Sequence, residues 1–267
     1  MQPPVAAIDV HTHLFPARLQ AAVRRALTRM YGWSFDLPDE PGAFAEFVRA
    51  RGTERFCVLP YAHKPGMARE LNAWMAETTR RLPGAIGFAC VHPDDSDSTD
   101  VLEDAFADGL IGVKLHHQVQ EVSPDDPRLF PVYELMLEHD RPLIVHAGKG
   151  PTDNGLVGAS PFRRMMKRFP HLRICVAHLG FPEREEFVAM LDEFPRLYLD
   201  TSGLGNMSLT GIGLEDRIER ILWGSDAPNI AFDYERAITR VLDLGLEPDD
   251  QRAIFRDNAL RFLRLER

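Results

Sequence analysis

Short apolar segments alternate with longer amphipathic segments along the chain. The apolar segments are rich in Val, Ile and Leu and are bounded by Gly, Pro or Asp, which is typical of strands buried on both faces. This pattern predicts strands at Val5–Val10, Arg55–Pro60, Ala85–Val91, Ile111–His116, Pro142–Ala147, Arg173–His178, Arg196–Asp200 and Ile221–Gly224.

The segments between these strands repeat apolar residues at helical spacing. In residues 66–82, for example, Leu71, Trp74 and Met75 fall near one face of a helix. Helices are predicted over residues 66–82, 97–108, 127–139, 160–169, 182–194, 231–244 and 248–264. The Gly-rich segment 202–219 is predicted to be mostly loop. Residues 30–42, with two prolines and two glycines, are predicted to be an insertion in the first strand–helix connection.

Alternating strands and helices predict parallel βαβ units. Eight strands match a (β/α)8 barrel, which commonly forms one domain of about 250 residues, so we expect residues 1–267 to be a single barrel domain. A doubly wound open sheet is the alternative. It usually has a Gly-rich turn after an early strand, but here the first strand runs into HTHLFP, which contains no glycine. The barrel is therefore preferred.

The overall composition narrows the class of protein. The formal net charge is -9, which argues against nucleic acid or an anionic membrane as a partner. The three cysteines are widely spaced and odd in number, so we expect buried thiols and no disulfide framework. The N-terminus lacks a basic region with a long apolar core, and no apolar run is long enough to cross a membrane. These features predict a cytoplasmic protein that acts on a small molecule.

Candidate metal ligands lie at the carboxyl ends of several predicted strands. His11 and His13 are two residues apart, so their imidazoles face the same side of the first strand. His146, His178 and Asp226 end the fifth, sixth and eighth strands. These ends converge on one face of a barrel, and imidazole and carboxylate groups are ligands that zinc prefers. The pattern predicts a metal site, with Asp226 as the general base for an attacking water.

Further polar residues lie at the same predicted face. Lys114 and His116 share one parity in the fourth strand. Lys114 could bind a substrate anion, be carboxylated and bridge two metals, or lie at the rim in solvent. His63 and His92 follow the second and third strands and could contact substrate, although His92 could instead cap its strand end. Asp9 either orients a ligand imidazole or is satisfied by backbone groups.

These motifs together resemble the amidohydrolase superfamily. The resemblance rests on IDVHTHLF, VKLHH, PLIVHAG, ICVAHLG, YLDTS and LWGSDAP, followed by DNALRFL, and it extends from Ile8 to the C-terminal helix. The branch it resembles is the amidohydrolase-related group, which includes aminocarboxymuconate-semialdehyde decarboxylase-like proteins and lactone hydrolases.

The resemblance implies roles for particular residues. His11, His13, His146 and Asp226 would be metal ligands, and His178 would be either a ligand to a second metal or a catalytic histidine. The fourth strand has Lys114 and no Glu, so a bridged pair of ions would require carboxylation of Lys114. We therefore expect one divalent ion, Zn²⁺ by ligand type, with two as the alternative. Substrate contacts are expected from Lys114, His116, His63 and His92.

Three functions remain open. The first is a hydrolase in which water attacks an amide, lactone or ester carbonyl of a small carboxylated molecule. The second is a non-oxidative decarboxylase of an aromatic or unsaturated acid, and the third is a non-catalytic metal-binding barrel. Decarboxylases of this group tend to be longer, so the compact chain favours the hydrolase. A homodimer is expected.

Overall fold

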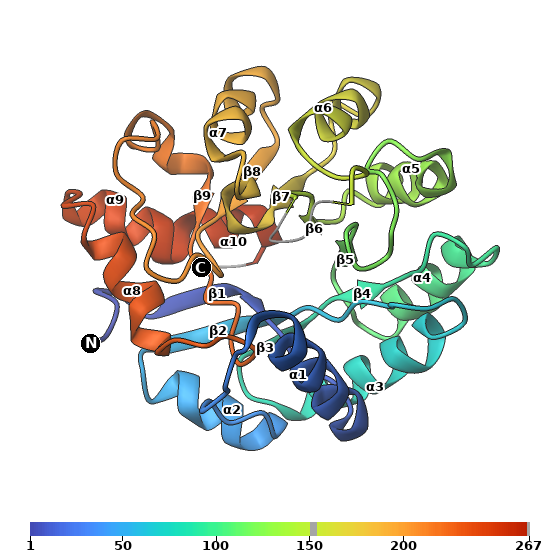
Figure 1. Ribbon diagram of the computed structural model, residues 1–267, viewed down its shortest axis with the longest axis horizontal. Helices are drawn as coiled ribbons and strands as arrows, with labels where there is room; N and C mark the ends of the chain where they lie inside the picture. The colour runs from blue at the N-terminus through green and yellow to red at the C-terminus, as the bar shows by residue number, and fades with distance from the viewer. Residues whose placement is uncertain (150–153, 266–267) are drawn as a thin grey trace.

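The predicted alternation of strands and helices is present in the computed structural model, which describes residues 1–149 and 154–265 (Figure 1). The strands are β1 (Ala7–Thr12), β2 (Thr53–Val58), β3 (Ala85–Gly87), β4 (Ala89–Cys90), β5 (Val113–His116), β6 (Leu143–His146), β7 (Ile174–Val176), β8 (Leu197–Asp200) and β9 (Ile221–Leu222).

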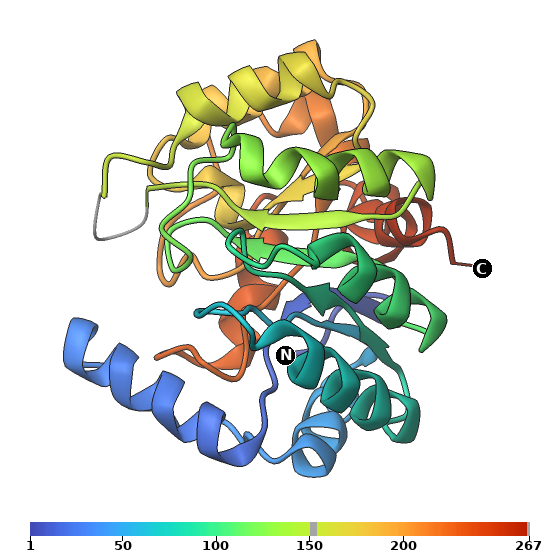
Figure 2. The same ribbon diagram turned by 90° about the vertical axis from the view of Figure 1, so that its right-hand side faces the viewer.

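Helices connect successive strands and surround them on the outside (Figures 1 and 2). They are α1 (Ala17–Tyr31), α2 (Pro41–Arg49), α3 (Ala68–Arg81), α4 (Ser98–Ala107), α5 (Phe130–Glu138), α6 (Ala159–Arg168), α7 (Arg184–Glu193), α8 (Tyr234–Leu242), α9 (Pro248–Arg252) and α10 (Asn258–Leu263). Shorter helical turns are η1 (Pro127–Leu129), η2 (Ala177–Gly180), η3 (Glu215–Arg220) and η4 (Ala253–Asp257). None of these helices is long and apolar enough to cross a membrane.

The parallel strands close into a barrel, as the sequence predicts. They form two runs, β1-β2-β3 and β4 through β9 in chain order. Phe88 separates β3 from β4, and its N–H donates to Val58 O at 3.1 Å, so the two pieces continue one interrupted strand. At the other seam, Val10 N–H donates to Trp223 O at 3.1 Å and His13 N–H to Ala227 O at 2.8 Å. The predicted (β/α)8 barrel is confirmed.

The barrel interior explains why the strands are so apolar. Side chains from β1, β2, β6, β7 and β9 pack together inside it, and Phe262 and Leu263 of α10 pack on the same cluster. A second, larger cluster fills the space between the strands and the outer helices. Both faces of each strand are therefore buried, which favours continuous Val, Ile and Leu runs. The three cysteines are buried and free, as expected.

The structure differs from the prediction at the first strand and after it. β1 continues to Thr12, because Asp226 N–H donates to His11 O and Leu59 N–H donates to Thr12 O. Helices α1 and α2 were not predicted. They include both ends of segment 30–42, and residues 32–40 join them. Gln20 is the only fully buried residue of α1, and Leu19 and Val23 are partly buried against the core. Figure 2 shows α1 extending away from the barrel.

Two later segments also differ from their predicted forms. The single helix predicted over residues 248–264 is divided, because the π-helical turn η4 lies between α9 and α10. The predicted strand Arg173–His178 ends at Val176, so His178 lies in η2. Segment 202–219 is mostly loop, as predicted, with η3 near its end.

Asp9 connects three elements inside the barrel wall. Its Oδ1 accepts hydrogen bonds from the N–H groups of His11 (3.1 Å) and Ser225 (3.0 Å), and its Oδ2 accepts one from the Tyr234 hydroxyl at 2.9 Å. Asp9 is therefore satisfied largely by backbone and does not orient an imidazole. Burial raises the pKa of Asp9 to about 7, against the opposing effect of these hydrogen bonds.

Substituting Asp9 by Asn should change how stability depends on pH. Below the ordinary pKa of 3.8, the wild-type carboxyl is protonated in both the folded and unfolded chains. Between pH 3.8 and about 7 the unfolded chain ionises first, so the wild-type free energy of unfolding falls. The amide can keep the two backbone hydrogen bonds and does not titrate. In urea unfolding, the free energy of unfolding of Asp9→Asn should therefore increase relative to that of the wild type as pH rises through this range. Above this range the difference should stay constant. A pH-independent difference would contradict the raised pKa.

Candidate metal centre

His11 and His13 bring two ring nitrogens together near the end of β1. Alternate strand residues face the same side, and the two Nε2 atoms are 3.2 Å apart. Thr12 faces the other way, and its hydroxyl donates to Cys57 O at 2.7 Å. Both histidines are buried, with 0% and 6% of their surface exposed. The predicted common orientation of the pair is confirmed.

The partners of the other ring nitrogens determine where each proton lies. Nδ1 of His11 is 2.8 Å from Asp200 Oδ2, and Nδ1 of His13 is 2.6 Å from the backbone oxygen of Leu59. A carboxylate and a carbonyl only accept hydrogen bonds, so we assign the proton to Nδ1 in both rings. In the neutral rings, each Nε2 then presents a lone pair, which is the form that binds metal.

Asp226 completes a cluster with these two nitrogens. Its Oδ1 lies 3.0 Å from His13 Nε2 and 3.6 Å from His11 Nε2. Burial raises the pKa of Asp226, but His13 and the neighbouring histidines outweigh it, so the pKa falls below its ordinary value and the carboxylate stays ionised. Asp226 has a φ of 73°, a strained backbone conformation that costs about 1–3 kcal/mol and is typical of functional sites.

This cluster fits a divalent cation. His11, His13 and Asp226 form one of two groups of potential ligand atoms, all within 4.8 Å of one another, among the described residues. In the neutral rings, three lone pairs directed at one another repel unless a proton or a metal cation lies between them. Two imidazoles and one carboxylate are a donor set that zinc and other first-row divalent metals accept.

The second group, His11, His178 and Asp200, is held together by hydrogen bonds instead. Besides His11 Nδ1, Asp200 accepts from the N–H groups of His178 and Ser202, both at 3.0 Å, and from the Ser202 hydroxyl. Burial opposes ionisation of Asp200, but its histidine partners lower its pKa overall. Asp200 therefore orients His11, a role that the sequence reasoning considered only for Asp9. The sequence contained a signal for this role, since Asp200 ends the predicted strand Arg196–Asp200 and the other site residues lie at or just after the ends of their predicted strands.

His178 lies beside this cluster. Its ring centroid is 5.0 Å from that of His11 and 5.0 Å from that of His146. The backbone at His178 and Leu179 has φ values of 56° and 53°, which non-glycine residues rarely adopt. This turn ends β7 early and brings the imidazole back over the barrel mouth. The two predicted roles of His178, metal ligand and catalytic group, stay predictions.

His146 and His116 form a stacked pair on neighbouring strands. Their ring centroids are 4.2 Å apart, and the two residues are paired in the register of β5 and β6. Burial and neighbouring positive groups lower the pKa of both rings, which favours neutral imidazoles. His146 Nε2 is buried without a hydrogen-bond partner among the described residues. It does not join either group of potential ligand atoms in that part of the chain, so its role as a ligand stays a prediction.

Lys114 lies inside the barrel, as its parity predicts. Only 1% of it is exposed, so the alternative of a solvated lysine at the rim is wrong. Its Nζ is 3.3 Å from His11 Nε2. Burial lowers the pKa of Lys114 to about 8, and Asp200 and Asp226 oppose this shift. Lys114 is thus an amino group next to the ligand cluster that can carry a positive charge or be carboxylated.

His63 and His92 lie further along the loops. His92 Nδ1 accepts a hydrogen bond from Asp94 N–H at 3.2 Å, which is the capping role considered for it. Burial lowers the pKa of both rings. No hydrogen bond or ring contact of the described residues joins either histidine to His11, His13 or Asp226, so their contact with substrate stays a prediction.

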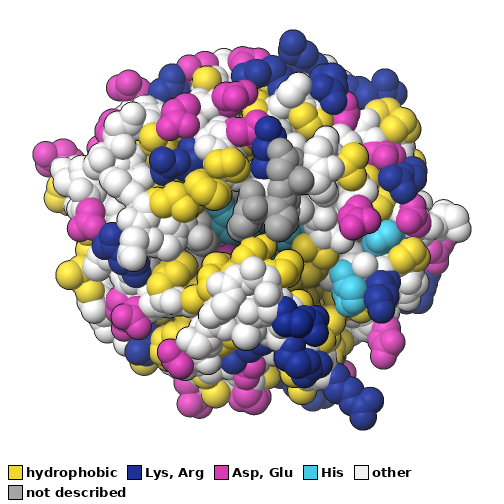
Figure 3. Space-filling view, in the orientation of Figure 1, with side chains coloured by type: hydrophobic (Ala, Val, Ile, Leu, Met, Phe, Trp, Pro, Cys, Tyr) yellow, Lys and Arg dark blue, Asp and Glu magenta, His cyan; other side chains and the backbone are white. Residues whose placement is uncertain are grey.

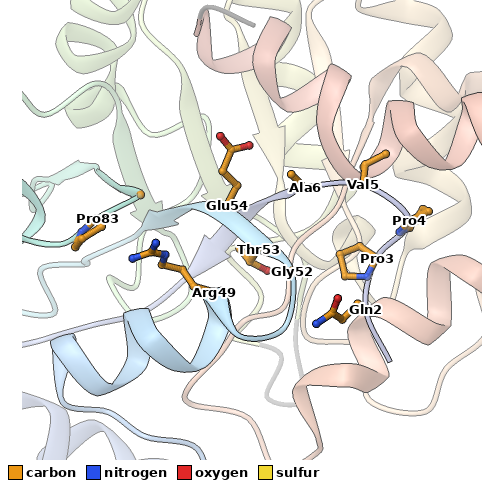
Figure 4. A pocket seen from close by; sticks show the side chains of 11 residues that line it. Gln2, Pro3, Pro4, Val5, Ala6, Arg49, Gly52, Thr53, Glu54 and Pro83 are labelled. Atoms are coloured by element: carbon orange, nitrogen blue, oxygen red, sulfur yellow. The ribbon is translucent and has the colours of Figure 1, made fainter.

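Figure 3 shows histidine side chains near the middle of the face on which the strands' carboxyl ends open. A different hollow, of about 530 Å³, lies at the amino ends of β1, β2 and β3 (Figure 4). Its lining includes Gln2, Arg49, Thr53 and Glu54 but no histidine or cysteine. The cluster of His11, His13 and Asp226 therefore lies at the opposite end of the barrel from this hollow.

The fold and this cluster define a class of protein, a (β/α)8 barrel with metal-ligand side chains at the carboxyl ends of its strands. The family model described as amidohydrolase matches residues 8–265. The chain therefore belongs to the amidohydrolase family and is an enzyme of that metal-dependent kind. A divalent metal ion agrees with both the family and the His/Asp cluster.

Several solved structures share this fold. A TIM-barrel protein from Bordetella bronchiseptica is 21% identical, with a TM-score of 0.75 over 97% of this chain and 99% of that one. A dihydroxybenzoic acid decarboxylase from Polaromonas, with bound manganese, is 18% identical, with a TM-score of 0.70 over 100% and 98%. A probable 2-pyrone-4,6-dicarboxylic acid hydrolase from Acinetobacter baumannii is 15% identical, with a TM-score of 0.69 over 97% and 99%. No curated protein matches the chain in sequence. At these identities the likeness concerns the fold.

Replacing Asp200 by Asn should weaken metal binding. The amide removes the charge that holds the His11 Nδ1 proton, and loss of such a partner typically costs about 10- to 100-fold in metal affinity. Titration of metal-free protein with Zn²⁺ or Mn²⁺ measures the change. Asp9→Asn is the matched control, because Asp9 is equally buried and touches His11 only through its backbone N–H. Equal affinities for the two variants would contradict the role of Asp200.

Proposed function

We propose that this enzyme is a metal-dependent hydrolase that cleaves an amide, lactone or ester bond in a small carboxylated molecule. The observation that carries the proposal is the placement of Asp226. Its carboxylate is ionised, its Oδ1 faces the two histidine lone pairs, and its side chain is 19% exposed, so it is accessible from the barrel mouth. A group with these properties can contact both a cation and a water molecule.

His11, His13, His146 and Asp226 would hold the ion. Zinc suits this donor set, and manganese is the metal in the Polaromonas decarboxylase of the same fold. A divalent ion bound there lowers the pKa of a water molecule and polarises a carbonyl oxygen.

The chain's own residues then move the proton and bind the substrate. Asp226 accepts the proton of the attacking water and returns it to the leaving group. In the neutral ring His178 accepts a hydrogen bond from the water, and in its protonated form it donates one to the reacting carbonyl. Lys114 supplies positive charge for a substrate carboxylate, with His116 beside it and with His63 and His92 further out on the loops.

A second candidate is non-oxidative decarboxylation on the same site. More of the similar solved structures are named as decarboxylases than as hydrolases, including enzymes for 2,6-dihydroxybenzoate and 5-carboxyvanillate. In this reaction the ion and His178 would stabilise the charge that develops as CO₂ leaves.

Substituting Asp226 by Asn should separate catalysis from metal binding. With loss of the general base, kcat should fall by about 10²- to 10⁴-fold, while elemental analysis should still find much of the metal. Asp233→Asn is the control, because this residue lies on the same connection but is exposed. Full activity of Asp226→Asn would show that the base is assigned wrongly, and wild-type protein that binds no divalent metal would contradict both candidate reactions.

A substrate panel distinguishes the two reactions. Metal-loaded enzyme is incubated with 2-pyrone-4,6-dicarboxylate, simple lactones, 2,6-dihydroxybenzoate and 5-carboxyvanillate. Acid release is followed by pH-stat and CO₂ by mass spectrometry. Hydrolysis predicts acid release without CO₂ from the lactone-type compounds. Release of CO₂ from the aromatic acids, with no lactone cleavage, would favour the decarboxylase.

A further inference from the structure

The hydroxyl of Ser202 lies between the two histidine systems of the site. Ser202 is fully buried in the loop that follows β8. Its Oγ is 2.9 Å from His178 Nδ1 and 3.1 Å from His11 Nδ1, and it is hydrogen-bonded to Asp200 Oδ1. One hydroxyl therefore contacts the carboxylate that orients His11 and the ring of His178.

The chemistry of these partners gives each contact a direction. Asp200 Oδ1 also accepts from the N–H groups of His178 and Ser202, so it is an acceptor here and Ser202 uses its single proton for Asp200. Towards His178 the hydroxyl can then only accept. The backbone oxygen of Ser202, 3.0 Å from the same Nδ1, is also an acceptor. His178 must therefore carry its proton on Nδ1, which leaves a lone pair on Nε2 in the neutral ring.

Gly203 supports the same arrangement from the next position. Its φ is 66°, and a Cβ placed there would lie 2.5 Å from His178 Nδ1 and 3.0 Å from Asp226 Oδ2. Only a residue without a side chain leaves both groups where they are. The loop itself is fixed, because the buried Arg240 donates to the backbone oxygens of Thr201 and Gly205.

We propose that Ser202 and Gly203 are positioning residues for His178. The single carboxylate of Asp200 then orients two imidazoles, that of the metal ligand His11 and that of His178. Asp200 holds His11 directly and His178 through the Ser202 hydroxyl, while Gly203 leaves room for the His178 ring. The proposal rests on the proposed function in that it gives His178 a part in the reaction. Its structural content, the Nδ1–H form of His178, can be measured without turnover.

The first test substitutes Ser202 by Ala. The control is Ser208→Ala, because Ser208 is exposed in the same loop and its hydroxyl contacts only Thr210. Metal-free protein labelled with ¹⁵N-histidine reports the tautomer of each ring by long-range ¹H–¹⁵N NMR, and His178→Gln assigns the signals. We expect a single Nδ1–H form in the wild type and in Ser208→Ala. In Ser202→Ala only the backbone oxygen of residue 202 still accepts from Nδ1, so we expect part of the rings to change to the Nε2–H form.

Activity and metal content give a second readout for the same variant. Because Asp200 still holds His11, Ser202→Ala should keep its metal, with kcat reduced about tenfold or more and KM little changed. Histidine spectra and a kcat identical to those of Ser208→Ala would overturn the proposal. If the wild type shows the expected tautomer but turns over none of the probes, the proposed function fails and the positioning role stands.

The second test compares two glycines that have similar backbone conformations. Gly205 also has a left-handed φ, 53°, but a Cβ there meets nothing within 4 Å. Alanine strains the backbone at both positions, and only at Gly203 does it displace His178 and Asp226. We expect Gly203→Ala to lose about 10- to 100-fold in kcat and Gly205→Ala to remain close to the wild type. Equal losses in the two variants would show that the effect is loop strain, which overturns the role of Gly203.

Discussion

The site depends on three acceptor atoms that face one another at close range. His11 Nε2, His13 Nε2 and Asp226 Oδ1 lie within 3.6 Å of each other, and both rings are held in the tautomer that leaves these nitrogens unprotonated. With both rings neutral, such an arrangement is repulsive unless a proton or a metal cation lies between the three atoms. The rest of the barrel mouth can be understood as the structure that holds these atoms in place and supplies the groups that act beside them.

Part of the free-energy cost of this arrangement is strain in the backbone. His178, Leu179 and Asp226 have left-handed conformations that glycine would adopt more easily. The neighbouring backbone pairs hold Asp226, because its N–H donates to His11 O and the next residues pair with β1 at the seam of the barrel. The seam that closes the fold therefore also places Asp226, the proposed general base, next to the two histidines.

Much of this could be predicted from the sequence, for physical reasons. Continuous apolar strands between amphipathic helices predicted the barrel, and strand parity predicted that His11 and His13 lie together and that Lys114 faces inward. The predictions that failed concern single elements and single side-chain contacts. α1 was not predicted, although its apolar residues Leu19, Val23 and Leu27 recur at helical spacing. The left-handed turn at His178 has no signature in ICVAHLG. Asp9 and Asp200 are both strand aspartates, and only the spatial arrangement shows that Asp200 reaches the His11 ring while Asp9 reaches backbone.

The assignment of the metal site to His11, His13 and Asp226 can be examined by anomalous diffraction from crystals grown with Zn²⁺ or Mn²⁺. We expect one peak at bonding distance, about 2.0–2.2 Å, from the two Nε2 atoms and from an Asp226 oxygen. A peak at the Nδ1 side of His11, beside Asp200 and His178, would contradict it, as would a barrel mouth that contains no peak at saturating metal.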